Sequence, residues 1–587
     1  MGSRVLAGCF AAFVVLRLAT LDPAAISNDG PQHLWAAFVD AHDVAGYTLH
    51  APPTSNGAHQ LLLGLLRLGL EPLRALAVAG VIVAALFAGG FTSLCLACDR
   101  RRWPLALFGL GAGDQLAALA GTLPFLLALT AGMGVLAWTL VAPSARTSTK
   151  LATSAGLLVT AWLHIVPAAI FGVVVTIVAV ARGPTRIRVL LESVLMGGPA
   201  LAVVAMTIGL PTSSVEVHSV LLAPTLSGLA GAFLPQAPVA EAVLFVVAIV
   251  GGVMTVVLRP SASTVAVGVA AVGLVLLGIA VSPDAIGWEL MRERVFGVGV
   301  LLAVPLVPTE RVTARSSALL AALALAWSVH VYEATARLNE AVARVMAPVV
   351  EASAHLPPLT GRWMIVLTQL PPGDEPRRGW LAAWLHVGQA MAVHLGGLPA
   401  YSQDDAPAFH HMLRAGADEA GRTTAPSPVR WPQLWRATPQ QRSALVSAYA
   451  AWGATISGLV VVGPADEMAL FTERGHRVIA STPVAATGLV AYSTSFVGCS
   501  VTASLRAVVD HDDVVEVGFF PASEPLASFP VASGRDVVHL HGIPCGADLW
   551  FRLRLSGCAE QLGSARAAMP AVGVEPLVLP CTPKKKS

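Results

Sequence analysis

Residues 72–97 are PLRALAVAGVIVAALFAGGFTSLCLA, and no charged side chain occurs between Arg74 and Asp99. A helix that spans a membrane needs about 20 predominantly apolar residues. This stretch therefore predicts a transmembrane helix, and comparable stretches recur up to about residue 336. The expected spans are 4–21, 72–97, 103–117, 122–142, 150–166, 167–181, 189–210, 240–258, 263–281, 295–309 and 316–336.

Two of these regions have an alternative. Residues 150–181 could instead form one long helix that kinks at Pro167, because proline removes a backbone donor. Residues 4–21 could be a signal peptide, but Arg17 interrupts the apolar run and the residues 21–23 that follow make a poor cleavage site. We therefore expect a retained span.

The composition supports a membrane protein. Of the 587 residues, 55% are hydrophobic and 12% are charged, whereas soluble proteins carry about 25% charged residues. The net charge of +2 gives no indication of a nucleic-acid partner. The apolar excess ends near residue 336, and charged runs such as 510–513 follow it. We expect a mostly α-helical membrane domain of about eleven spans over residues 1–336, followed by an α/β or β-rich domain over residues 337–587.

The second part shows its own pattern. A helical run extends from about Ser316 through Ala354, and residues 363–367 resemble a strand. Helices are expected around 379–395 and 437–453. The β-rich runs are 458–462, 477–480, 488–492, 514–520, 537–540 and 549–555.

Basic residues predict the orientation of the chain, because Arg and Lys collect on the cytoplasmic side of a membrane. With the expected spans, one side receives Arg4, Arg100, Arg101, Arg102, Arg146, Lys150, Arg182, Arg186, Arg188, Arg259, Arg311 and Arg315. The N-terminus is then cytoplasmic and the C-terminal domain extracytoplasmic. The outer side receives the loops 22–71, 211–239 and 282–294.

The first outer loop contains Asp29-Gly30-Pro31-Gln32-His33. Proline suits the first turn of a helix, so Asp29 is expected at a helix start with His33 one turn further on. An acid and an imidazole would then lie together at the outer surface of the membrane. The alternative is a capped helix with no chemical role.

Two more polar residues fall at expected outer tips, namely Asp114 and His164. An ionisable group in or near a membrane is costly and is a candidate for function. The alternatives are a hairpin turn at Asp114 and a packed, hydrogen-bonded ring at His164.

Arg292 and Arg294 lie outside, against the usual trend of positive charge. A guanidinium group binds phosphate in a bidentate manner, so this pair suits a phosphate at the mouth of a span. The alternative is a salt bridge to Glu289 or Glu293. Further on, His386, His394 and His410-His411 could contact a metal, but their spacing fits no strong zinc pattern.

Taken together, these motifs resemble the GT-C superfamily of membrane glycosyltransferases, in an uncharacterised bacterial branch. The matching features are an Asp-Gly-x-x-His first loop from Asp29 to His33, a His-x-x-Pro from His164 to Pro167, an Arg near a late span, and His386 followed by Gly396-Gly397. The first loop has Asp29-Gly30 in place of an acidic pair, and the W-W-D-Y-G motif of oligosaccharyltransferases is absent.

The resemblance implies a hexosyl- or pentosyltransferase of the bacterial inner membrane and cell envelope. It would use a sugar linked to polyprenyl phosphate and an acceptor glycan, lipid or protein. Asp29, Asp114 and His33 would be catalytic, and Gln32, His164, Arg292, Arg294 and His386 would bind substrate. Asp29 and Asp114 would hold a divalent metal such as Mg²⁺ or Mn²⁺ if one is used. Competing interpretations are a lipid-linked polymer ligase, a transporter and a non-catalytic envelope scaffold.

Overall fold

A computed structural model describes most of the first 369 residues and the strands of the later part. The described residues are 2–25, 27, 29–44, 47–50, 56–142, 146–182, 186–208, 231–258, 261–280, 291–309, 313–359, 361–369, 387–399, 412–415, short pieces between 434 and 449, 458–496, 499–505, 513–519, 527–531, 537–543, 548–554, 561–566 and 577–579. Two compact units form, one mainly from residues 1–344 and one mainly from residues 345–587.

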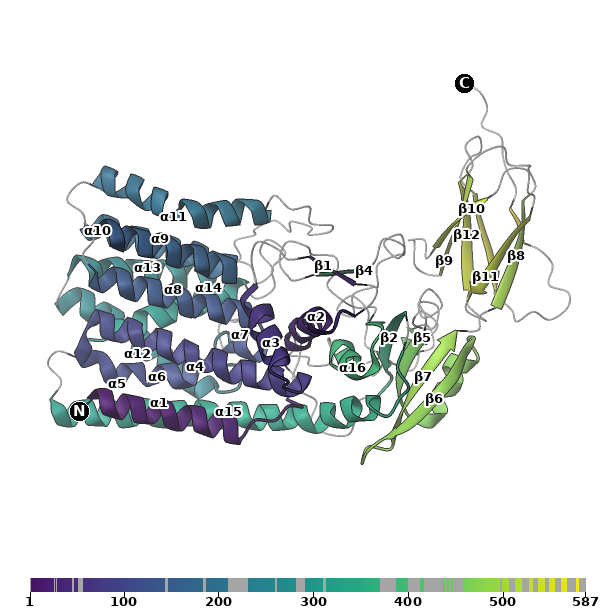
Figure 1. Cartoon of the computed structure of the whole chain (residues 1–587), viewed down its shortest axis with the longest axis horizontal. Coiled ribbons are helices and arrows are strands. Elements are labelled where there is room, and N and C mark those ends of the chain that lie inside the picture. Colours follow the sequence, from purple (N-terminus) through teal and green to yellow (C-terminus); the bar gives the residue numbers. More distant parts are fainter. Residues whose placement is uncertain are drawn as a thin grey trace, which may run out of the picture. The chain divides into compact units, whose positions relative to one another are not determined.

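The first unit is a bundle of helices (Figure 1). Among the described residues, six helices are long and apolar enough to cross a membrane. They are α1 (Gly2–Ala19), α4 (Pro72–Cys98), α8 (Leu123–Val141), α10 (Ile165–Arg182), α13 (Ala262–Ala280) and α15 (Ala314–Ser353). The protein is therefore a multi-pass membrane protein, as the sequence predicts.

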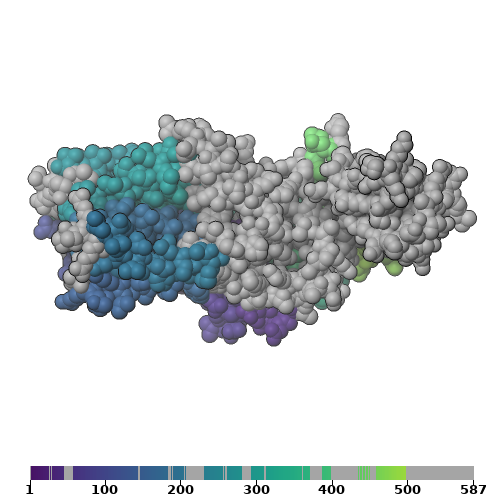
Figure 2. Space-filling view, turned by 90° about the horizontal axis from the view of Figure 1, so that it is seen from above, coloured from purple at the N-terminus to yellow at the C-terminus, as the bar shows by residue number. Residues whose placement is uncertain are grey.

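Other helices complete this unit: α2 (Gly30–His42), α3 (Asn56–Arg67), α9 (Thr147–Leu163), α11 (Arg186–Ile208), α12 (Pro238–Leu258) and α14 (Met291–Ala303). In this unit, large apolar side chains are exposed on α9 to α12. On α9 to α11, coloured blue in Figure 2, these include Leu151, Leu158, Val173, Leu191 and Leu195. A lipid surface accommodates such side chains without polar partners.

The expected span 103–117 is wrong as a single helix. The chain forms a 3₁₀ turn at Arg100–Arg102 and three short helices, α5 (Trp103–Ala106), α6 (Phe108–Ala112) and α7 (Leu116–Leu119). Gly109 and Gly111 let this segment approach its neighbours closely, since a Cβ at either position would lie within 3 Å of Phe91 or of Ser328. The broken helix brings Asp114 and the turn after α7 to the ends of the longer helices.

Residues 150–181 form two helices, α9 and α10, so the alternative of one helix kinked at Pro167 is wrong. The break falls at His164, whose backbone is extended (φ −169°, ψ 135°). Pro167 lies in the first turn of α10, where its missing N–H leaves no hydrogen bond unmade. The imidazole of His164 consequently sits at a helix junction.

Helix α15 extends beyond the expected span 316–336, as the predicted helical run to Ala354 requires, and its last residues belong to the second unit. Further basic residues of the first unit lie at helix ends. Arg102 donates to the carbonyl of Pro305, Arg182 donates to that of Thr139, and Lys150 Nζ lies 2.6 Å from a carboxylate oxygen of Glu192.

The second unit contains a five-stranded mixed sheet in the order β3-β2-β5-β7-β6. Its strands are β2 (Arg362–Leu367), β3 (Leu398–Pro399), β5 (Gly458–Gly463), β6 (His476–Val484) and β7 (Leu489–Phe496). Strand β2 is parallel to β3 and β5, and β7 is antiparallel to β5 and β6. Met364, Val366, Leu459, Val461 and Phe471 form the centre of its core.

Two further sheets follow in the chain. One has the order β10-β9-β12-β13, built from β9 (Asp513–Phe519), β10 (Ala527–Val531), β12 (Asp548–Arg554) and β13 (Gln561–Arg566). The other has the order β11-β8-β14, built from β8 (Cys499–Leu505), β11 (Val537–Ile543) and β14 (Leu577–Leu579). The expected α/β or β-rich character of this part is confirmed.

Candidate active site

Asp29 lies at the start of α2, as predicted, with Pro31 in the first turn. Its backbone N–H donates to the carbonyl of Ala120 at 2.8 Å. Gln32 and His33 follow within one turn and are both buried. The side chain of Asp29 makes no capping bond to α2, so the helix start does not depend on that carboxylate.

The turn after α7, at residues 120–122, packs closely against the loop that carries Asp29. Gly121 has a φ of +80°, a left-handed conformation that favours glycine. A Cβ at Gly121 would lie 2.5 Å from Ser27 Oγ and 2.6 Å from the backbone nitrogen of Gly30. The Asp29 loop and the turn at residues 120–122 therefore pack backbone to backbone, directly before α8.

The ring of Phe125, on the first turn of α8, brings two predicted residues together. The His164 ring meets it edge-on at 5.6 Å between centroids, with an interplanar angle of 90°. The guanidinium carbon of Arg294 lies 5.3 Å from the same centroid, within the range of a cation–π interaction. The imidazole of His164 and the guanidinium of Arg294 thus contact the same ring, which lies four residues after Gly121 in the chain.

Hydrogen bonding indicates the state of His164. Its Nδ1 accepts from the N–H of Val166 at 3.2 Å. In a neutral imidazole with Nδ1 as acceptor, the proton is carried by Nε2. A neutral His164 therefore carries its ring proton on Nε2.

The two arginines at the start of α14 differ in their surroundings. Residues two positions apart on a helix point to different sides, and Arg292 and Arg294 stand in this relation at the start of α14. Arg292 is buried, and Arg294 is the one that lies against Phe125. The structure thus places Arg294 and the His164 ring against the same Phe125 ring.

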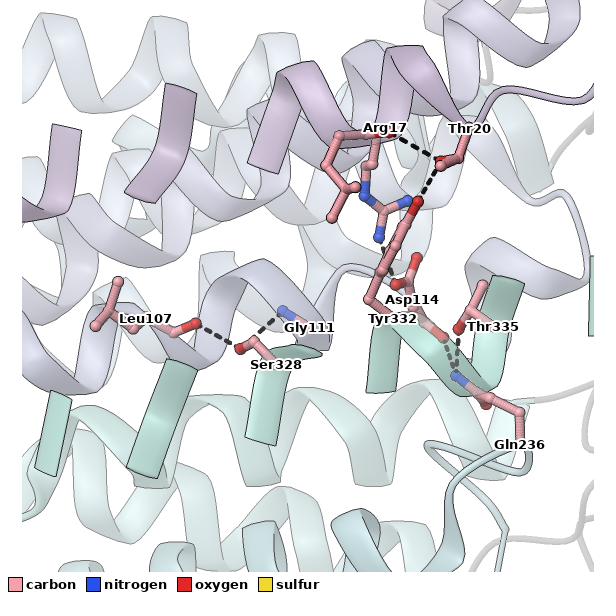
Figure 3. Close-up of polar contacts among 10 residues, drawn as sticks. Arg17, Thr20, Leu107, Gly111, Asp114, Gln236, Ser328, Tyr332 and Thr335 are labelled. Atoms are coloured by element: carbon pink, nitrogen blue, oxygen red, sulfur yellow. Dashed lines mark hydrogen bonds and ion pairs between the residues drawn. The ribbon is translucent and has the colours of Figure 1, made fainter. Parts of the chain in front are cut away.

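Asp114 is buried and forms an ion pair with Arg17 of α1 (Figure 3). The guanidinium carbon of Arg17 also lies 4.5 Å from the Phe13 ring centroid and 5.3 Å from that of Tyr332. The tip at Asp114 is thus built into the helical bundle, and the short helix α7 separates it from the turn that holds Asp29.

Sequence reasoning assigned no role in a site to several polar residues, including Arg17, Gln236, Glu241 and His59. Arg17 could have been found, because an arginine within an apolar span needs a partner. Glu241 accepts hydrogen bonds from the backbone N–H groups of Gly231 and Phe233. No local sequence motif predicts these contacts. Asp40 Oδ2 lies 3.0 Å from the Nε2 of the buried His59.

Among the residues that the structure describes, no three His, Cys, Asp or Glu side chains gather in a way that could hold a metal ion. Asp114, one of the two expected metal ligands, forms an ion pair with Arg17. His386 lies outside the described residues, and Gly396-Gly397 follows α16 (Val387–Leu395) with φ near +67° at both glycines.

Comparisons with known proteins give structural matches only. No family model and no curated protein matches the chain. The fold is similar to that of ArnT from Cupriavidus metallidurans bound to undecaprenyl phosphate, with a TM-score of 0.48, 13% identity and coverage of 84% of this chain and 98% of ArnT.

Two further structures are similar. The mycobacterial arabinofuranosyltransferase AftD gives a TM-score of 0.46 at 14% identity over 86% of this chain and 41% of AftD. The Archaeoglobus fulgidus oligosaccharyltransferase gives 0.35 at 10% identity over 99% of both chains. All three are GT-C glycosyltransferases, the class that the sequence resembles. At identities of 10–14%, the likeness concerns the fold alone.

Proposed function

We propose that this protein is a membrane glycosyltransferase that moves a sugar from a polyprenyl-phosphate donor to an acceptor outside the cytoplasm. One observation carries the proposal: the Asp29 loop, His164 and Arg294 converge on residues 120–125. A carboxylate can serve as the general base for such a transfer, and an imidazole and a guanidinium can bind and stabilise the phosphate. The donor class comes from the resemblance of the sequence motifs to GT-C enzymes.

The reaction would proceed by attack of an acceptor hydroxyl on the anomeric carbon of the donor. Asp29 would take the hydroxyl proton as general base. The bond between the anomeric carbon and the phosphate oxygen would break, and polyprenyl phosphate would leave with the electron pair. Arg294 would stabilise the charge that develops on this phosphate, and the Nε2–H of His164 would donate to a substrate oxygen. His33 and Gln32 would orient the substrate beside Asp29.

The first test compares three strains: wild type, a deletion, and the deletion carrying Asp29→Asn. Envelope glycans and polyprenyl-phospho-sugars would be measured in each. We expect the deletion and Asp29→Asn to accumulate one lipid-linked sugar and to lack its product, while Asp29→Asn inserts into the membrane normally.

The matched control is Asp22→Asn. Asp22 belongs to the same loop, is exposed, and accepts from the N–H of Ala24 at 2.9 Å. This variant should keep wild-type glycans. If the deletion alters neither pool, the transferase proposal fails and a transporter or scaffold becomes the better account. Transfer of an intact polymer, in place of a single sugar, would instead indicate a ligase.

A further inference from the structure

The loop that carries Asp29 is held at both ends by one short piece of chain, residues 114–120. The loop begins after α1, where Arg17 pairs with Asp114 (Figure 3). Its far end is Asp29, whose N–H donates to Ala120 at 2.8 Å. Only Gln115 and the four-residue helix α7 lie between Asp114 and Ala120. A shift at Asp114 would therefore be passed to the backbone of Asp29.

Arg17 is enclosed on several sides. Its side chain is 12% exposed, and the Asp114 side chain is 4% exposed. The rings of Phe13 and Tyr332 flank the guanidinium, and the Tyr332 hydroxyl bonds to Thr20 at the end of α1. A carboxylate in this position is neutralised by its cation and is poorly placed to receive a proton from a substrate.

Hydrogen bonds with residues 233–236 also hold the backbone of residues 114–116. The Nε2 group of Gln236 donates to the Asp114 carbonyl at 2.8 Å and to Thr335 Oγ1 at 3.1 Å. The N–H of Leu116 donates to the Phe233 carbonyl at 2.8 Å. Residues 114–116 are thus held by α1, by α15 and by the segment before α12.

We infer that Arg17 and Asp114 are positioning residues for Asp29 and take no part in proton transfer or metal binding. The inference rests on the proposed function, because it concerns the placement of the proposed base. It replaces the catalytic role that the sequence motifs suggest for Asp114 with a supporting one.

The test uses two single variants, Arg17→Gln and Asp114→Asn, and the double variant that combines them. Removing one partner of a buried ion pair leaves an uncompensated buried charge, whereas the double variant leaves no buried charge at either position. In detergent, each single variant should melt roughly 5 °C or more below the wild type, and each should form much less product in the complemented deletion strain. The double variant should recover most of both quantities, with the wild-type dependence of product formation on pH.

Lys150 and Glu192 provide the control pair, since their side chains are 31% and 28% exposed. Neutralising either one should change the melting temperature little, because partly exposed pairs contribute little.

Three results would overturn the inference. A stable double variant that makes no product would show that Asp114 acts directly. Single variants with wild-type stability and product would show that the pair positions nothing. A double variant as unstable as the singles would show that the loss does not come from an unpaired charge. The melting measurements do not depend on transfer. If the wild type has no transferase activity, the proposed function fails, and the ion pair can then be judged only by the stability of the variants.

Discussion

At the scale of single residues, Arg294 matters through its shape as well as its charge. It lies 5.3 Å from the Phe125 centroid, where a planar guanidinium can stack. Arg294→Lys keeps the charge and loses the planar stacking and the bidentate grip on phosphate. We expect product formation to fall about tenfold or more, which corresponds to a loss of about 1.4 kcal/mol in the transition state.

This prediction is checked by initial rates of transfer in membranes, with Arg315→Lys as the control. Arg315 is exposed at the start of α15 and has no predicted role in the site. Equal rates for wild type and Arg294→Lys would mean that only the charge at this position is used.

His59 gives a prediction about pH. Burial lowers the pKa of His59 below its ordinary value, and the hydrogen bond to Asp40 only partly offsets this effect. The folded protein therefore disfavours the protonated ring. The stabilising contribution is complete above the unfolded pKa, about 6.5, and is lost as pH falls below it.

The melting temperature of the wild type should thus decrease between about pH 7.5 and 5.5, and His59→Gln should show a smaller decrease. His42→Gln is the control, since His42 is an exposed histidine of the neighbouring helix α2. An identical pH profile for His59→Gln and wild type would remove His59 from this effect.

At the scale of elements, the turn between α7 and α8 decides where the Asp29 loop can sit. Gly121→Ala adds a Cβ that would meet Ser27 Oγ and the Gly30 nitrogen at about 2.5 Å, in a left-handed backbone conformation. The backbone cost alone is about 1–2 kcal/mol. We expect a lower melting temperature and a loss of transfer.

Gly134→Ala is the matched control, because Gly134 lies within α8 and a Cβ there meets nothing within 4 Å. Alanine is the better helix former, so this variant should be as stable as the wild type or more so. Retained transfer in Gly121→Ala would show that the loop does not depend on this close approach.

The same elements show what a sequence can reveal. Apolar length predicts α4 and α8, and the Asp-Gly-Pro turn predicts the start of α2, because each signal is local. The broken helix at residues 103–119 is not predictable in this way. Its apolar residues resemble those of a span. Its glycines, however, are needed because Phe91 and Ser328, which lie on other helices, pack too close to leave room for a Cβ.

The candidate site follows the same rule. Asp29, His164 and Arg294 are identifiable as polar residues at expected helix ends. Their convergence is not, since it depends on the Phe125 ring and the Gly121 turn, which carry no polar signal. For Arg17, the sequence shows that a charged residue lies within a span, but it does not show that Asp114 is its partner.

At the scale of the whole molecule, the charge distribution makes a prediction about orientation. The positive-inside rule places the start of α9 in the cytoplasm and the end of α15 outside. Ser148 and His355 are exposed residues at these two places. In intact cells, a membrane-impermeant maleimide should label His355→Cys above the wild-type background and should leave Ser148→Cys unlabelled.

Permeabilised cells provide the control, because both cysteines should then react. The orientation is also a requirement of the proposed chemistry, since the Asp29 turn lies between α1 and α2, at the opposite end of α1 from the N-terminus. Labelling of Ser148→Cys alone in intact cells would invert the topology. It would place the Asp29 turn in the cytoplasm, where an acceptor outside the cell could not reach it.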